Sequence, residues 1–301
     1  MERLPIEIVT YILETAAYML RATDRGAVVN LALTSSFSYS TVAPILYERV
    51  VIADVNYAAF SVLLANGPLA AKVLQYTRFI CVPPNREEVL FSAAHLFPNV
   101  SAVYGSQSVW EDIVAAQAQS SVAIVNDLRA WYIGFKARAC QPNLSIVTRL
   151  HTFFPCSSKD RRGLPRDIAE QIQHILEVLP SLTHLGFSHV NPESPIENAE
   201  SKDLEIYDTV MRTVVASKES RLQVVALRIT GWAATCLEAF VRIARDIDEA
   251  GSMLEVRIWV DSREITTWQT EVDAMVEDSR KERSIWTEAQ ALSYYVPDVT
   301  T

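Results

Sequence analysis

Residue types that often carry out chemistry are present in this sequence, but their spacing predicts no reaction centre. The 5 histidines include His151, His184 and His189, which lie in segments with strand-like patterns. No His-x-x-x-His pair occurs, and no cysteine lies beside a histidine, whereas metal ligands usually recur at a recognisable spacing. The sequence therefore predicts no metal site.

The cysteines give no sign of redox or structural cross-linking chemistry. The 4 cysteines, Cys81, Cys140, Cys156 and Cys236, lie far apart and form no Cys-x-x-Cys motif. This pattern favours buried free thiols in a reducing compartment over a disulfide framework.

Motifs for hydrolysis and phosphate binding are also absent. No Gly-x-Ser-x-Gly elbow occurs, so an α/β-hydrolase would lack its nucleophile. With 8 glycines in the whole chain, no Gly-x-Gly-x-x-Gly loop follows a strand. The acidic runs Glu87-Glu88 and 246–249 are interpreted as solvated helix faces. We therefore predict no catalytic residue and no cofactor, although an α/β enzyme of unknown chemistry stays open as a third hypothesis.

One basic segment, Lys159–Arg166, interrupts an otherwise acidic chain. It is interpreted as a loop between a strand ending at Phe154 and a helix beginning at Asp167, partly neutralised by Asp160 and Asp167. A nuclear-import signal or a contact with an acidic partner is the alternative.

Length and charge limit the classes of function. The chain has 301 residues, of which 50% are hydrophobic, and a net charge of −9. Such a charge disfavours binding to nucleic acid or to an anionic membrane, since both attract cationic proteins. No apolar run approaches the ~18 residues of a membrane-spanning helix, and the N-terminus lacks a signal-peptide layout. These features predict a folded protein of the cytoplasm or nucleus.

The elements that could carry a function begin with three short helical patterns in the first fifty or so residues. Pro5 and Glu7 suit the first turn of a helix that carries Ile8, Ile12, Leu13 and Ala16 as one apolar stripe. Thr23-Asp24 can cap a second helix, and Ser40 can cap a third with Pro44 near its start. So small a cluster buries little surface, so some of its apolar residues must be covered by the rest of the chain or by a partner.

Three blocks of this region, in order, resemble an F-box. They are Leu4-Pro5-x-Glu7-Ile8-x-x-x-Ile12-Leu13, Leu31-Ala32-Leu33-Thr34-Ser35-Ser36-Phe37 and Ala43-Pro44-Ile45-Leu46-Tyr47-Glu48-Arg49-Val50. Two features depart from the family pattern: a longer connection over Glu14–Ala27, and Leu33-Thr34-Ser35 where Val-Cys-Arg is usual.

The resemblance implies a partner and a set of contact residues. F-box proteins dock on the Skp-type linker protein of cullin–RING ubiquitin ligases and present a protein substrate through the region that follows. The residues that it implies for linker binding are Leu4, Pro5, Ile8, Ile12, Leu13, Leu31, Phe37, Leu46 and Tyr47.

The rest of the chain alternates between helical and strand-like patterns. Strands are predicted at Phe79–Val82, Leu128–Ile133, Val147–Phe154, Val225–Ile229 and Leu254–Val260, with further strand segments inside Phe97–Tyr104 and Leu179–Phe187. Helices are predicted at Tyr57–Leu74 with a break at Asn66-Gly67-Pro68, and at Glu87–Leu96, Val109–Ala118, Asp167–Leu179, Asp203–Ala216, Thr235–Ala250 and Thr270–Arg283. One strand-plus-helix unit cannot bury its own apolar face, so each unit needs neighbours.

This second region resembles the irregular leucine-rich repeats that commonly follow an F-box. We therefore predict an α/β fold with an F-box-like module over residues 1–53 and a solenoid of parallel strands and helices over residues 54–301. An ordinary doubly wound α/β domain shows the same alternation and is the alternative.

Alternation along the predicted strands separates an inward from an outward face. Taking Leu185, Phe187, Leu227, Ile229, Ile258 and Val260 as inward places Gly186, Arg228 and Trp259 outward. Tyr104, Trp131 and His151 are grouped with them as candidate substrate-binding residues, because Arg, Tyr and Trp are enriched at interface hot spots. Membership of the core is the alternative at each position, and the strand register at Trp131 is ambiguous.

The sequence thus leads to an adaptor hypothesis with a specific rival. In the adaptor hypothesis, the chain is a non-enzymatic substrate-recognition subunit that binds a Skp-type linker and an unidentified protein substrate. In the rival hypothesis, the chain is a repeat scaffold whose first helices form a structural cap, as solenoids need polar-faced caps.

Overall fold

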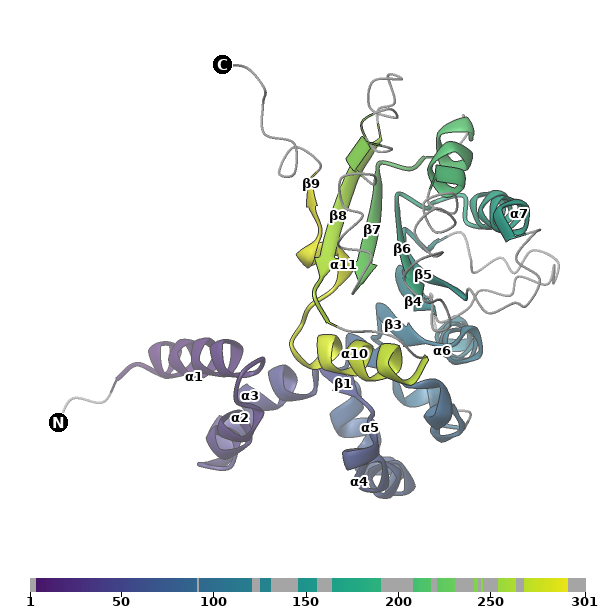
Figure 1. Cartoon of the computed structure of the whole chain (residues 1–301). Coiled ribbons are helices and arrows are strands. Elements are labelled where there is room, and N and C mark those ends of the chain that lie inside the picture. Colours follow the sequence, from purple (N-terminus) through teal and green to yellow (C-terminus); the bar gives the residue numbers. More distant parts are fainter. Residues whose placement is uncertain are drawn as a thin grey trace, which may run out of the picture. The chain divides into compact units, whose positions relative to one another are not determined.

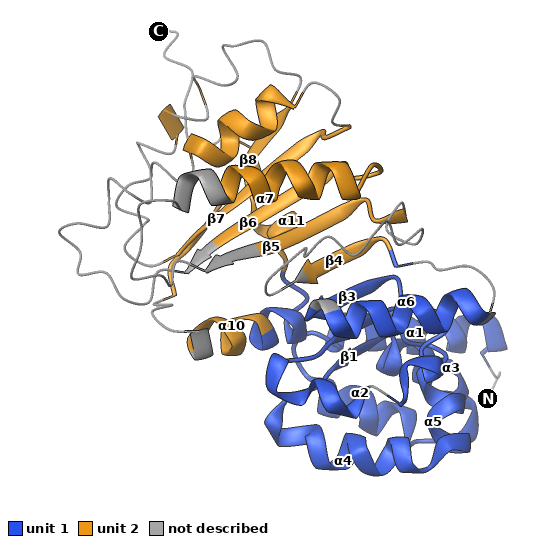
Figure 2. Ribbon diagram, turned by 90° about the vertical axis from the view of Figure 1, so that its right-hand side faces the viewer, with its two compact units in different colours: residues 1–125, 276–283 blue, residues 126–275, 284–301 orange. Residues whose placement is uncertain are grey.

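The computed structural model describes residues 4–90, 92–120, 125–130, 146–155, 164–190, 208–217, 221–230, 241–242, 245, 254–263 and 268–291. The chain forms two compact units, which are coloured separately in Figure 2. Unit 1 contains Met1–Val125 and Val276–Arg283, and unit 2 contains Asn126–Met275 and Ser284–Thr301. Both units have mixed α/β structure. The three N-terminal helices share unit 1 with the elements that follow them, whereas the predicted domain boundary lies at residue 53.

The N-terminal helices of unit 1 are α1 (Ile6–Leu20), α2 (Arg25–Ala32) and α3 (Ser36–Tyr47), drawn in purple in Figure 1. The predicted cap of α2 is confirmed, because the Asp24 carboxylate accepts a hydrogen bond from the Ala27 N–H at 2.9 Å. The predicted start of α3 is wrong. Ser35 caps this helix by accepting from the Ser38 N–H at 3.0 Å, and Pro44 lies within it.

The connection between α1 and α2 is shorter than the sequence suggests. The helix α1 continues to Leu20, so that only Arg21–Asp24 separate it from α2. The alanine-rich segment that resembles a long connection is therefore part of α1. This result fits the high helix propensity of alanine.

The rest of unit 1 contains three parallel strands and their connecting helices. The strands are β1 (Arg49–Val51), β2 (Phe79–Cys81) and β3 (Ala102–Gly105), and each pairs with the next along the chain. The connecting elements are α4 (Asp54–Ala65), α5 (Gly67–Leu74), the 3-10 segments η1 (Pro84–Val89) and η2 (Ala94–Leu96), and α6 (Gln107–Ser120). The predicted helix break is confirmed at Asn66, whereas Gly67 and Pro68, which are predicted to belong to the break, form the start of α5. The predicted helix at Glu87–Leu96 is wrong, because the two 3-10 segments occupy that range.

Unit 2 is built on strands that pair in the order of the sequence. The parallel strands are β4 (Asp127–Ala130), β5 (Arg149–Pro155), β6 (His184–Val190), β7 (Val224–Thr230) and β8 (Glu255–Asp261), and β9 (Gln290–Ala291) pairs antiparallel to β8. Its helices include α7 (Leu164–Val178), a helix at 208–216 and α11 (Ile285–Glu288). The helix α10 (Trp268–Arg280) contributes residues to both units.

Most elements predicted for this half of the chain are confirmed, with boundary shifts of a few residues. The predicted helix over residues 235–250 lies outside the described residues, except for 241–242 and 245. The clearest predicted helix is α7, in which Ile168, Ile172 and Ile175 are buried along one side. In Figure 2 this helix lies over β5 and β6.

The two faces of the unit 2 strands differ in chemistry. One face carries apolar residues that include Leu185, Leu227 and Ile258, all buried. The other face carries His151, Gly186, Ser188, Arg228 and Trp259, since the register places Arg228 opposite both Ser188 and Trp259. The predicted assignment of inward and outward strand residues thus agrees with the observed register.

Candidate docking interface on the N-terminal helices

The helix α1 exposes large apolar side chains to an unusual extent. Ile8 is 47%, Ile12 51% and Met19 74% exposed, and Tyr11 and Tyr18 are exposed beside them. Leu4 and Ile6 are also exposed where the helix begins. Scattered apolar residues on a protein surface need no explanation, but a contiguous apolar face marks an interaction surface. We define the α1 face as Ile8, Tyr11, Ile12, Tyr18 and Met19.

Helical geometry places these residues on one side of α1. Ile8 and Ile12 are one turn apart, Met19 follows two turns after Ile12, and Tyr11 and Tyr18 are separated by two turns. The single apolar stripe expected from the sequence is therefore wrong. Ile8 and Ile12 point outward, whereas Leu13 lies on the opposite side of the helix and packs on a core.

A small core holds α1, α2 and α3 together. Its buried members are Ala17, Val28, Ala32, Val42 and Ile45. Three of the predicted linker-binding residues, Leu13, Leu31 and Leu46, are partly buried and pack against these members. Their contacts with the core account for their apolar character without a partner.

The other predicted linker-binding residues fall into two groups. Leu4, Pro5, Ile8 and Ile12 are exposed. Phe37 and Tyr47 are of intermediate burial. Burial, followed by the neighbouring Tyr39 hydroxyl, raises the pKa of Tyr47. The exposed set therefore lies on α1 and the two residues before it, and the half-buried set lies on α3.

Ion pairs fix the C-terminal end of α1 within unit 1. The Arg21 guanidinium contacts the Glu48 carboxylate and lies 2.6 Å from the Glu282 carboxylate. These side chains are less than a third exposed, and such partly buried, bidentate contacts are stronger than surface pairs. The ion pairs hold the C-terminal end of α1, and the α1 face runs along the helix from Ile8 to Met19.

The residues predicted to bind substrate are not on the surface. Tyr104, His151, Arg228 and Trp259 are all buried, with at most 6% exposure. Trp131 lies outside the described residues. The expected exposure of the four described side chains is therefore wrong.

In unit 2 the physical reason is a cover from later in the chain. Ile285 and Ala289 of the α11 segment pack on Ala226 and Trp259, while Trp286 stacks edge-on against His184. Strand alternation alone cannot reveal that a distant helix covers the outward face.

The covered face contains a network of charged side chains. The Arg228 guanidinium donates to the Asp261 carboxylate at 2.8 Å and 3.0 Å and to the Glu271 carboxylate at 2.6 Å. It also lies 4.7 Å from the ring centroid of Trp259. Arg263 donates to the same Asp261 carboxylate at 2.6 Å. Sequence reasoning missed Asp261 and Glu271, because no local motif links them to Arg228.

Burial and neighbouring charges shift the pKa values in this network. Burial alone would raise the pKa of Asp261, but the hydrogen bonds from Arg263 and Arg228 and the charge of Arg228 lower it from 3.8 to about 2. Burial, reinforced by the charges of Arg129 and Arg228, lowers the pKa of His151 well below 6.5. Asp261 is therefore ionised and His151 neutral at neutral pH.

A histidine–serine pair occurs beside these charges. The Nε2 atom of His151 lies 2.8 Å from the Ser188 Oγ, a distance at which a general base could activate a nucleophile. However, His151 is 1% and Ser188 0% exposed, so substrate has no access to the pair in this structure. The arrangement is that of satisfied buried polar groups.

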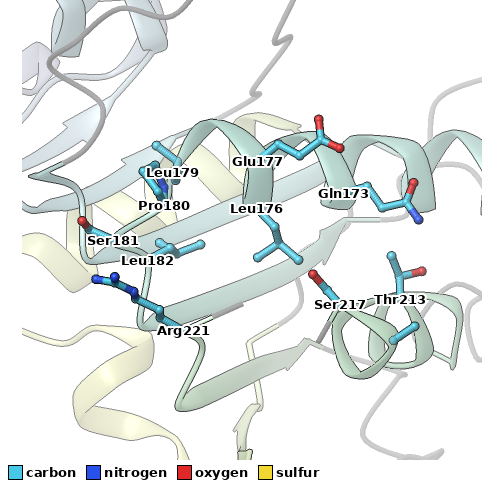
Figure 3. Close-up of a pocket in the computed structure, with 11 residues that line it drawn as sticks. Gln173, Leu176, Glu177, Leu179, Pro180, Ser181, Leu182, Thr213, Ser217 and Arg221 are labelled. Atoms are coloured by element: carbon cyan, nitrogen blue, oxygen red, sulfur yellow. The ribbon is translucent and has the colours of Figure 1, made fainter. Parts of the chain in front are cut away.

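A groove lies beside α7 in unit 2 (Figure 3). Its volume is about 1070 Å³, and its lining includes Leu176, Leu182 and Arg221. In Figure 3, Gln173 and Leu176 of α7 point toward the helix at 208–216. Apolar side chains with polar groups around them are typical of binding surfaces.

The described residues contain neither a metal-binding cluster nor a single membrane-spanning helix. No group of at least three His, Cys, Asp or Glu side chains in these ranges could hold a metal ion. No single helix in the described part of the chain is long and apolar enough to cross a membrane. The pair α4 and α5 reaches that length and apolar composition only when taken together, and it is bent by 112° at its break.

Comparisons with known proteins add no identification. No family model, no curated protein and no solved structure matches this chain.

Proposed function

We propose that the protein is a substrate-recognition adaptor of a Skp–cullin–F-box type ubiquitin ligase. In this proposal the N-terminal helices bind the Skp-type linker, and the strand-and-helix region binds a protein substrate. Ubiquitin transfer is carried out by other subunits, and the chain itself is assigned no catalysis, cofactor, nucleic acid or membrane. The protein acts in the cytoplasm or nucleus.

The observation that supports linker binding most directly is the exposed α1 face, whose Ile8 and Ile12 belong to the first F-box-like block. Burying a leucine or isoleucine side chain fully stabilises by about 1.5–3 kcal/mol, so half-exposed Ile8 and Ile12 would contribute roughly 1 kcal/mol each. Tyr11 and Tyr18 add the large, rigid contact area that is typical of binding hot spots. A partner that covers this surface therefore gains favourable binding free energy, and the α1–α3 core need not change.

The arrangement of strands supports a repeat-like region for substrate binding. Within each unit the parallel strands pair in the order of the sequence, without the reversal that a doubly wound sheet contains. This order is expected of stacked strand-and-helix repeats. Since the predicted outward residues of unit 2 are covered, we assign substrate binding to the α7 groove lined by Leu176, Leu182 and Arg221.

Linker binding is tested by comparing two variants of the full chain. The first is Ile8→Asp with Ile12→Asp, which places charges on the α1 face. The second, Val62→Asp, is the matched control, because Val62 is 72% exposed on α4 outside the helices α1–α3. Linker affinity should fall at least tenfold in the first variant, equivalent to about 1.4 kcal/mol, and stay unchanged in the second.

Circular dichroism of the double variant distinguishes a docking role of the α1 face from a role as a structural N-terminal cap. Ile8 and Ile12 are exposed, so the double variant is expected to remain folded while losing the linker. If it unfolds, the α1 face has a structural role, and the scaffold with an N-terminal cap is favoured. If the parent chain does not bind any Skp-type linker, the adaptor proposal is wrong.

Substrate binding is tested separately at the groove. The parent chain, Val62→Asp and the α1 double variant should all capture the same substrate proteins in a pull-down. Leu176→Asp should not capture these proteins. Linker binding by Leu176→Asp should remain at the parent level. Capture that is unaffected by Leu176→Asp would remove the groove from the proposal.

A further inference from the structure

A second surface of unit 1 gathers positive charge around a small cavity. The cavity has a volume of about 20 Å³, and four arginines contribute to its lining: Arg21, Arg25, Arg49 and Arg280. Ile45, Leu46, Val51, Ser279 and Glu282 complete it. This volume is enough for one atom the size of a water oxygen.

The carboxylates nearby are already used by one arginine. Arg21 contacts both Glu48 and Glu282. Arg49 lies 4.0 Å from Glu282, at the limit of an ion pair. Among the described residues Arg25 and Arg280 form no ion pair with a carboxylate. The four arginines therefore exceed the two carboxylates, Glu48 and Glu282, in charge at the cavity.

Several donors at the cavity lack acceptors among the described residues. Arg25 uses Nη2 to donate to the carbonyl oxygens of Leu46 and Arg49, at 2.8 Å and 2.9 Å, which leaves Nε and Nη1 available. The Arg49 Nε and the Ser279 Oγ are buried without a hydrogen-bond partner. A buried donor without an acceptor is destabilising, because it has lost its hydrogen bonds to water.

Like charges around one cavity also disfavour each other. Partial burial and then the positive charges of Arg49 and Arg280 lower the pKa of Arg25. An anion between these guanidinium groups would relieve their repulsion and accept their free N–H groups. Guanidinium groups are well suited to this role, because their N–H groups match the oxygens of phosphate.

We propose that this cavity binds a phosphate-type oxyanion, with one oxygen inside it and the others at its mouth. Arg25 and Arg280 supply the charge that no carboxylate neutralises, and Arg49 and Ser279 supply buried donors. The oxyanion is either free phosphate or the phosphoryl group of a phosphorylated peptide. The site is separate from the α1 face and does not depend on linker binding.

Calorimetric titration of the full chain with inorganic phosphate, in a chloride buffer of constant ionic strength, tests the proposal. Arg280→Gln should weaken phosphate binding about tenfold, which corresponds to the loss of one charge-assisted hydrogen bond. Arg280 is exposed and has no ion pair among the described residues, so the fold should be preserved, as checked by circular dichroism. Arg78→Gln, which removes an exposed arginine elsewhere in unit 1, is the matched control and should bind phosphate like the parent chain.

A second titration with a phosphoserine peptide and its unphosphorylated form identifies the source of the oxyanion. Tighter binding of the phosphopeptide than of phosphate indicates a protein ligand, and the reverse indicates free phosphate. In either case Arg280→Gln and Ser279→Ala should weaken binding. The proposal is overturned if neither probe binds, or if both variants bind the probes as tightly as the parent chain.

Discussion

The buried network around Arg228 leads to a quantitative prediction at Asp261. Replacing Asp261 by Asn keeps the shape of the side chain but removes its charge. Asp261 is 5% exposed and accepts hydrogen bonds from both Arg228 and Arg263. The substitution therefore tests whether this network stabilises unit 2 through its charges.

The magnitude follows from the shifted pKa. A pKa of about 2 in the folded protein, against 3.8 in the unfolded chain, corresponds to about 2 kcal/mol of stability at pH 7. Because the folded pKa is the lower one, this stability is fully present above pH 4 and is lost as the pH falls toward 2. At pH 3, roughly half of it should remain. The difference in the free energy of unfolding between the parent chain and Asp261→Asn should therefore shrink as the pH falls.

Urea titrations at pH 7, 5, 4 and 3, followed by tryptophan fluorescence, measure this difference. Hydrogen exchange in β7 and β8 at pH 7 then locates the change in unit 2. Glu255→Gln is the control, since Glu255 lies on the same strand but pairs with Arg257 at the surface. Glu255→Gln should change the free energy of unfolding by no more than about 0.5 kcal/mol.

Two results would refute the reasoning about Asp261. The first is a loss that is equally large at pH 7 and pH 3, which would assign the effect to packing. The second is a variant more stable than the parent chain. Neutralising a buried ionic network can stabilise a protein, and retention of such a network against stability points to a function. That outcome would revive the α/β enzyme hypothesis.

Three further predictions concern other parts of the structure. His151→Gln should flatten the dependence of stability on pH. In the parent chain buried His151 stays neutral, whereas the unfolded chain takes up a proton as the pH falls through 6.5, so urea titrations should show a loss of stability from pH 7.5 to 5.5 that the variant lacks. Ile45→Ala should lower the free energy of opening of the α1–α3 core, measured by hydrogen exchange, by about 2–4 kcal/mol. Ile8→Ala, at an exposed position, should change the same free energy by less than about 0.5 kcal/mol. Gly186→Ala should loosen α11, since a Cβ atom at residue 186 would lie 3.1 Å from Ile285 and Trp286. Faster exchange in residues 285–289 is the expected readout, and unchanged exchange would show that these side chains can move aside.

Local pattern was sufficient to predict many of the elements. Apolar spacing located α7, and alternation located β6, β7 and β8 and assigned their two faces. Capping chemistry located α2 through Asp24 but misplaced the start of α3. Ser40 and Ser35 carry the same hydroxyl group, and only the structure shows that Ser35 caps α3, through the N–H of Ser38.

Contacts between distant segments were beyond prediction from local pattern. The charges on Arg228 and Glu271 are 43 residues apart in the chain. The cover over Gly186 comes from Ile285 and Trp286, and only the missing side chain at Gly186 makes room for it. The predicted exposure of Arg228 was wrong because this side chain is buried against Asp261, Glu271 and Trp259, and the pattern of its own strand contains none of these residues.

The contrast between these covered residues and the α1 face supports the adaptor proposal. In unit 2, an aromatic residue that strand alternation places outward, Trp259, is buried beneath α11. In unit 1, Ile8, Ile12 and Met19 remain exposed although α1 has a packed opposite side with Ala17 at 0% exposure. The exposed side therefore does not result from a helix that failed to pack. A helix that is apolar on both sides is expected where two neighbours cover it, and the described chain supplies one. A partner protein that covers the α1 face would supply the other.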